Sequence, residues 1–143
     1  MNKLTYIDDC QLDHFILKKM LSRFGSAYDV KCTDSGRGIL NLLSRHTVDT
    51  NKLPDIILLD IYIPGFDSWG FLEKMQSMYK YLPKPIEIYI LSASNYAADV
   101  ERAKQYNCVK AFILKPITKE VLQRLMKYKE SPVSRFATME YQN

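Results

Sequence analysis

The sequence predicts an α/β protein with a flavodoxin-like, doubly wound parallel sheet of five strands in the order 2-1-3-4-5. Five short runs rich in β-branched, aliphatic and aromatic residues alternate with segments in which apolar residues take helical spacing. Parallel neighbours need crossover connections, so this alternation implies a parallel sheet with helices on both faces. Five such units suit the flavodoxin-like strand order.

The expected strands are residues 4–7, 28–32, 55–59, 86–91 and 111–114. The third run is apolar without alternation, as a strand covered on both faces must be. A long loop at residues 47–54 leads into it, and the fourth helix is expected at residues 97–106. Three expected buried helix faces comprise Leu12, Phe15, Ile16 and Met20; Leu72, Met75 and Tyr79; and Val121, Leu125 and Met126.

A single domain is expected at residues 1–129, followed by a short tail at residues 130–143. Because fourteen residues cannot form an output domain, the expected protein is a stand-alone domain that acts through another protein. No apolar run reaches the ~18 residues that cross a bilayer, and the start of the chain lacks the apolar core of a signal peptide. We therefore expect a cytoplasmic protein without membrane attachment.

The net charge of +4 does not indicate nucleic-acid binding, because the basic residues are scattered and no recognition-helix or RNA-binding signature accompanies them. The cysteines Cys10, Cys32 and Cys108 form no C-x-x-C pair, and neither histidine is placed to complete a zinc site. We interpret them as reduced thiols, with the role of Cys10 unassigned. His14 is expected at the surface, and the Trp69, Phe71 and Leu72 side chains are expected to pack in the core.

Residues with carboxylate, hydroxyl or ammonium side chains follow four of the expected strands. Asp8 and Asp9 follow the first, Asp60 the third, Ser92 the fourth and Lys115 the fifth. In open parallel sheets, ligands gather beyond these carboxyl ends. Three clustered carboxylates repel one another, and their all-oxygen character selects a hard cation such as Mg²⁺. A carboxylate can accept a phosphoryl group, whose oxygens an ammonium and a hydroxyl can bind.

In this order and spacing the motifs resemble the receiver domains of two-component response regulators. The resemblance covers residues 4–128. It rests on the Asp8-Asp9 pair, LLDIYIPG at residues 58–65, LSAS at 91–94 and FILKP at 112–116. It implies that Asp60 is the phosphoacceptor and that a metal site comprises Asp8, Asp9, Asp60 and the backbone carbonyl of Tyr62, with Asp8 acting through a metal-bound water.

The resemblance also implies how the phosphoryl group is held and sensed. Ser92, the Ala93 backbone amide and Lys115 would contact it, and Phe112 would be the aromatic switch residue that turns inward as Ser92 moves. The Lys115–Pro116 peptide bond is expected to be cis. The sequence departs from the common pattern at Ser68, where glycine is usual, so we expect a reshaped loop before the third helix.

By the same resemblance the chain is a phosphorylation-dependent switch in a phosphorelay rather than an enzyme. A histidine kinase or histidine phosphotransfer protein would be the phosphodonor. An unknown protein would read the altered surface formed by the fourth helix, fifth strand and fifth helix.

Three alternatives are weighed against it. A haloacid-dehalogenase-like phosphatase needs a second aspartate two residues past the nucleophile, where Tyr62 or Cys10 stands. A flavodoxin-type redox protein needs a phosphate-cradling loop after the first strand, and that loop is absent. A receiver-fold scaffold that never takes phosphate remains the third, although all five site residues are intact.

Overall fold

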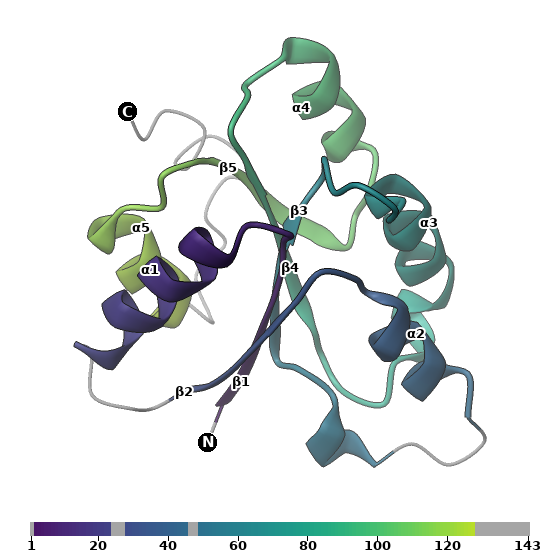
Figure 1. Cartoon of the computed structure of the whole chain (residues 1–143). Helices are drawn as coiled ribbons and strands as arrows, with labels where there is room; N and C mark the ends of the chain where they lie inside the picture. The colour runs from purple at the N-terminus through teal and green to yellow at the C-terminus, as the bar shows by residue number, and fades with distance from the viewer. Residues whose placement is uncertain (1, 24–27, 46–48, 128–143) are drawn as a thin grey trace.

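The computed structural model describes residues 2–23, 28–45 and 49–127 (Figure 1). The expected tail at residues 130–143 lies outside the described residues. In chain order the elements are β1 (Asn2–Ile7), α1 (Gln11–Ser22), β2 (Tyr28–Thr33), α2 (Arg37–Leu43), β3 (Ile56–Asp60), α3 (Ser68–Met78), β4 (Glu87–Ser92), α4 (Ala97–Lys104), β5 (Val109–Leu114) and α5 (Lys119–Lys127). Two 3₁₀ turns, η1 (Thr50–Lys52) and η2 (Tyr79–Tyr81), precede β3 and follow α3.

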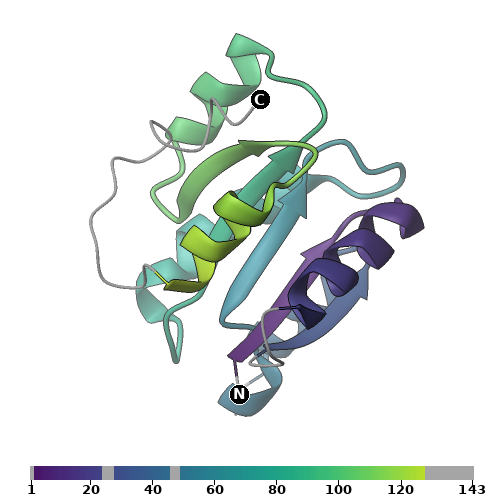
Figure 2. The same ribbon diagram turned by 90° about the vertical axis from the view of Figure 1, so that its left-hand side faces the viewer.

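The five strands form one parallel sheet in the order β2-β1-β3-β4-β5, which confirms the predicted fold. Each strand begins and ends within two residues of its expected range. The helices α1 and α5 cover one face, and α2, α3 and α4 cover the other (Figures 1 and 2). Ile7 pairs with Leu59, and Asp60 with Leu91, so the polar residues that end β1 and β3 lie at one edge.

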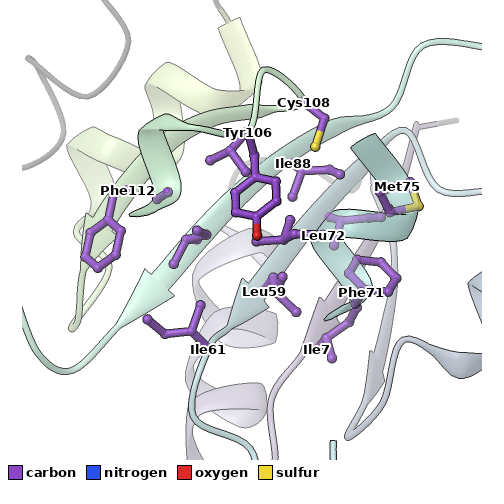
Figure 3. Close-up of a cluster of buried hydrophobic side chains, with 14 of the residues drawn as sticks. Ile7, Leu59, Ile61, Phe71, Leu72, Met75, Ile88, Tyr106, Cys108 and Phe112 are labelled. Carbon is purple, nitrogen blue, oxygen red and sulfur yellow. The ribbon is translucent and has the colours of Figure 1, made fainter. Parts of the chain in front are cut away.

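Two hydrophobic clusters hold the layers together, one on each face of the sheet. Ile57 and Leu59 of β3 belong to the cluster beneath α2, α3 and α4, whereas Ile56 and Leu58 belong to the cluster beneath α1 and α5. Alternate residues of a strand point to opposite faces, so a strand buried on both faces is apolar throughout, as predicted. Figure 3 shows the first cluster, in which the α3 side chains lie over the sheet.

The predicted buried faces of the later helices are largely confirmed. Leu72 and Met75 of α3 and Val121 and Leu125 of α5 are buried, and Tyr79 and Met126 pack at the edges of the two clusters. Phe71 also enters the core, with Trp69 half-buried beside it. Within the part of the chain described, no helix has the length and apolar character needed to span a membrane.

The predicted buried face of α1 is wrong for three of its four residues, and only Met20 packs against the core. Leu12, Phe15 and Ile16 are 64%, 57% and 42% exposed, and the helix instead buries Leu17 and Leu21 against the sheet. The helix carries apolar residues around more of its circumference than the sheet can cover. The side opposite Leu17 therefore faces outward as an apolar surface of Leu12, Phe15 and Ile16.

Three smaller expectations also need correction. His14 is not a surface residue: it is half-buried with its ring edge against Tyr6 at 5.1 Å between centroids, and its buried Nε2 has no hydrogen-bond partner among the described residues. The expected loop at residues 47–54 contains η1, and its Leu53 is fully buried. The fourth helix ends at Lys104 rather than 106, because Tyr106 leaves the helix to pack in the core.

Candidate functional site

Three carboxylates meet at the carboxyl ends of β1 and β3. Asp8 and Asp9 follow β1, and Asp60 is the last residue of β3. One oxygen from each lies within 4.8 Å of the others, and the two central residues, Asp8 and Asp60, are buried whereas Asp9 is exposed. Because the strands are parallel and in register at Ile7 and Leu59, the carboxylates converge from separate chain segments.

Asp8 is fully buried, and hydrogen bonds engage both its oxygens. Its Oδ2 accepts from the Tyr6 hydroxyl at 2.7 Å and from Lys115 Nζ at 2.6 Å, and its Oδ1 accepts from the Cys10 backbone N–H at 2.9 Å. Burial alone would raise the pKa of Asp8. The bonds from Lys115, Tyr6 and Cys10 outweigh burial and hold that pKa below its usual value.

Asp60 lies in a less favourable environment for its charge. Its Oδ1 accepts from the Tyr62 backbone N–H at 3.2 Å, and Lys115 Nζ lies 3.4 Å from its Oδ2. Burial, aided by the negative charge of Asp8, raises the pKa of Asp60 in spite of Lys115 and the Tyr62 amide. The backbone carbonyl of Asp60 accepts a 2.6 Å bond from the buried Ser68 hydroxyl, which fixes the end of β3.

Lys115 is the cation of the site and reaches three carboxylates. Its Nζ lies 2.6 Å from Asp8, 3.0 Å from Asp13 and 3.4 Å from Asp60. Burial alone would lower the pKa of Lys115, but the bonds that its ammonium donates to Asp8 and Asp13 outweigh burial and raise that pKa. The backbone N–H of Lys115 donates to the Ser92 carbonyl at 2.8 Å, and the Lys115–Pro116 bond is cis, as predicted.

Asp13 and Tyr6 belong to the site, although neither was predicted from the sequence. Tyr6 lies two residues before Asp8, and strand alternation places residues two apart on the same face of the sheet. Asp13 stands in the first turn of α1, the helix that begins at the site. In the sequence, Asp13 could have been found only as an acidic residue in the first turn of the helix that follows the Asp8-Asp9 pair.

The remaining predicted site residues lie around the same edge. Ser92 ends β4 fully buried, and its Oγ accepts from the Ser94 N–H at 3.1 Å, while Ala93 beside it is exposed. Phe112 points into the core on the α4 side and is 1% exposed. Tyr62 is 55% exposed, and its hydroxyl donates to Asp99 of α4.

The loop between β3 and α3 forms two ordered turns. Gly65 has a φ of +76°, a conformation that favours glycine, and the turn places the Phe66 N–H on the Ile63 carbonyl at 3.2 Å. Asp67 then caps α3 by accepting from the Gly70 N–H at 3.0 Å. A Cβ at position 70 would lie 2.5 Å from the Asp67 carboxylate, so glycine leaves room for the cap.

The donor set at this edge fits a hard divalent cation. Three carboxylates offer oxygen atoms only, and a cation would offset both the burial of the Asp60 charge and its repulsion by Asp8, which together raise the pKa of Asp60. Chemically, the edge combines a nucleophilic carboxylate, an adjacent ammonium and a buried hydroxyl.

Comparisons with a family model and with solved structures both relate the chain to response regulators. Residues 4–127 match the family model of the response regulator receiver domain. A two-component response regulator from Legionella pneumophila has a similar structure, with a TM-score of 0.73 and 22% identity over 88% of this chain and 95% of that one. A two-component response regulator from Cytophaga hutchinsonii gives a TM-score of 0.71 and 21% identity over 88% and 94%.

The signal receiver domain of the response regulator NarL from Mycobacterium tuberculosis gives a TM-score of 0.67 and 26% identity over 87% and 93% of the two chains. None of the curated proteins compared with the chain matches it in sequence.

Proposed function

The chain belongs to the family of response regulator receiver domains, and from this premise we propose that it is a phosphorylation-dependent switch whose phosphoacceptor is Asp60. Receiver domains are signalling domains of two-component systems rather than classical enzymes. One observation carries the assignment to Asp60. Asp8, Asp9 and Asp60 bring oxygens within 4.8 Å of one another, and Lys115 from the far end of the chain contacts two of them.

Asp8, Asp9 and Asp60, with the backbone carbonyl of Tyr62, would hold Mg²⁺ at this edge. When bound, the cation neutralises charge on the carboxylates and on the phosphoryl group that is being transferred. The all-oxygen donor set supports this choice of ion. Asp8 would act through a water, because bonds from the Tyr6 hydroxyl and the Cys10 backbone N–H engage both of its own oxygens.

In the transfer step a carboxylate oxygen of Asp60 forms a bond to phosphorus as the phosphorus–nitrogen bond of a phosphohistidine breaks. The electron pair of that bond leaves on the imidazole nitrogen. Lys115 Nζ, 3.4 Å from Asp60 Oδ2, is placed to donate to a phosphoryl oxygen. The Ser92 hydroxyl and the Ala93 backbone amide would bind the remaining phosphoryl oxygens.

The phosphodonor would be a histidine kinase or a histidine phosphotransfer protein in the cytoplasm, and a further protein would read the result. We place the output on the face formed by α4, β5 and α5. Ser92 is the last residue of β4, and Phe112 lies within β5. Within α4, only Ala103 is buried. A weakly buried helix is one that a small free energy can shift. Residues 1–129 would form this domain, with residues 130–143 as a tail.

Incubation with acetyl phosphate, followed by intact-mass measurement, tests the assignment. We expect one added phosphoryl group in the presence of Mg²⁺, none with EDTA and none in Asp60→Asn. Asp34→Asn is a matched control, because it removes a carboxylate just beyond β2 at the same edge of the sheet and should label normally. Equal labelling of Asp60→Asn would contradict the assignment. A wild-type protein that never labels would favour the phosphorylation-independent scaffold.

A further inference from the structure

Asp13 is a fourth carboxylate at the site, and its ion pair with Lys115 is as well formed as those of the others. Its Oδ2 lies 3.0 Å from Lys115 Nζ, between the 2.6 Å contact to Asp8 and the 3.4 Å contact to Asp60. The side chains of Lys115 and Asp13 are 16% and 32% exposed, so water screens this pair only in part. An ammonium group has three donors, and these three carboxylates account for all of them.

The three partners of Lys115 are not equivalent. Asp8 and Asp60 belong to the group of carboxylates whose oxygens converge within 4.8 Å, whereas Asp13 does not. A divalent cation on that group would draw on the same charges that hold Lys115, and would repel the ammonium. Among the described residues, Asp13 is the only ion-pair partner of Lys115 that such a cation leaves free.

We propose that Asp13 is the positioning residue that keeps Lys115 at the phosphoryl site while Mg²⁺ occupies the other carboxylates. With the cation bound, the ammonium keeps its contact with Asp13 and is released from Asp8, so the two positive charges are held apart. Lys115 then remains beside Asp60 instead of competing with the metal. This inference rests on the proposed function in one respect, namely that the three carboxylates bind Mg²⁺.

A simpler role for Asp13 makes a different prediction. A carboxylate in the first turn of a helix stabilises the helix dipole, and its charge also attracts any cation nearby. Both effects are independent of Lys115, because fixed charges act additively. If the effect of the Asp13 charge on Mg²⁺ affinity depends on the presence of Lys115, Asp13 acts by positioning Lys115 and not by simple attraction of the cation.

The test is a double-mutant cycle on Mg²⁺ affinity, measured by isothermal titration calorimetry at 0.1 M salt on wild type, Asp13→Asn, Lys115→Met and the double variant. Lys115→Met should bind Mg²⁺ more tightly, because the competing cation is gone. Asp13→Asn should weaken Mg²⁺ binding both in wild type and in Lys115→Met. The loss of affinity should be larger in wild type, by roughly threefold or more, as expected for residues in one charge network.

Asp34→Asn is the matched control, since it neutralises a carboxylate at the same sheet edge that is not among the partners of Lys115. Its effect on Mg²⁺ affinity should be small and equal in both backgrounds. Thermal melting of each variant establishes that it is folded.

Equal factors for Asp13→Asn in the two backgrounds, or no effect in either, would overturn the positioning role while leaving the Mg²⁺ site intact. If none of the proteins binds Mg²⁺, the proposed function and this inference both fall.

Discussion

Replacing Asp60 by asparagine should stabilise the protein in the absence of divalent cations. Asn retains an oxygen that can accept from the Tyr62 N–H, so the hydrogen bond of 3.2 Å survives and only the charge is lost. At an effective dielectric constant of about 20, two unit charges within 4.8 Å of one another repel by at least about 3.5 kcal/mol. The 3.4 Å contact between Asp60 and Lys115 offsets this repulsion with about 5 kcal/mol of attraction. Repulsion from Asp8 thus cancels most of the attraction.

Burial of the Asp60 carboxylate decides the sign. The raised pKa of Asp60 means that burial and repulsion by Asp8 together outweigh the attraction of Lys115, so the folded state disfavours the charged form of Asp60. We expect Asp60→Asn to gain about 1–2 kcal/mol in the free energy of unfolding at neutral pH, which is roughly 3–8 °C in Tm for a domain of this size.

The assay is thermal and urea unfolding in EDTA and in excess Mg²⁺. In EDTA the variant should be the more stable protein. Mg²⁺ at about 100 times its Kd should add roughly 2.7 kcal/mol to wild type alone and so close or reverse the difference. A variant that is less stable than wild type in EDTA would refute the view that the three carboxylates repel one another.

The pH dependence gives a second check with a defined sign. The folded-state pKa of Asp60 is raised, so its charge costs stability above that pKa, and protonation restores it. As the pH falls through the raised pKa, the stability of wild type should rise toward that of Asp60→Asn, so the difference in their free energies of unfolding should shrink. A difference that grows over this range would contradict the assignment of the repulsion to Asp60.

Three further predictions concern the output helix and the core. Beryllium fluoride should change hydrogen-exchange protection in residues 92–106, where α4 is weakly buried, and around Phe112, and should leave α1 after Leu12 largely unaffected. Tyr62→Phe should speed exchange in α4, since it removes the bond to Asp99, while costing under about 1 kcal/mol for a pair this exposed. Leu72→Ala should cost about 2–5 kcal/mol in urea unfolding, against within about 0.5 kcal/mol for the exposed Leu12→Ala.

Each of these has a result that counts against it. Changes with beryllium fluoride confined to α1 and residues 49–54 would mean that the output face is misassigned. Unaltered exchange of α4 in Tyr62→Phe would show that the contact with Asp99 does not restrain the helix. A large loss of stability in Leu12→Ala would contradict the exposed placement of the α1 apolar surface.

The sheet and the centre of the site could be predicted because both are properties of short segments. A strand such as β3, buried on both faces, needs an unbroken apolar run, and that run ends in Asp60. The carboxyl ends of parallel strands meet at one edge whatever the details of the helices. Knowledge of the strands was therefore enough to bring Asp8, Asp60, Ser92 and Lys115 together.

The orientation of α1 could not be predicted in this way. Apolar side chains surround much of this helix, and both the side with Leu12 and the side with Leu17 have helical spacing. In the folded protein the side with Leu17 and Leu21 meets the sheet, and this choice is a property of the assembled layers rather than of the helix alone. The role of Asp13 was hidden for a similar reason, because it depends on a lysine 102 positions away in the chain.

The contacts of Trp69 have a practical consequence. It is the single tryptophan of the chain, and on α3 it stacks with Tyr106 at 6.1 Å between ring centroids, with the guanidinium of Arg102 in α4 at 4.4 Å from its own ring. Both neighbours lie in or just after the proposed output helix. The indole is thus a built-in optical reporter, and a displacement of α4 would alter its emission without any added label.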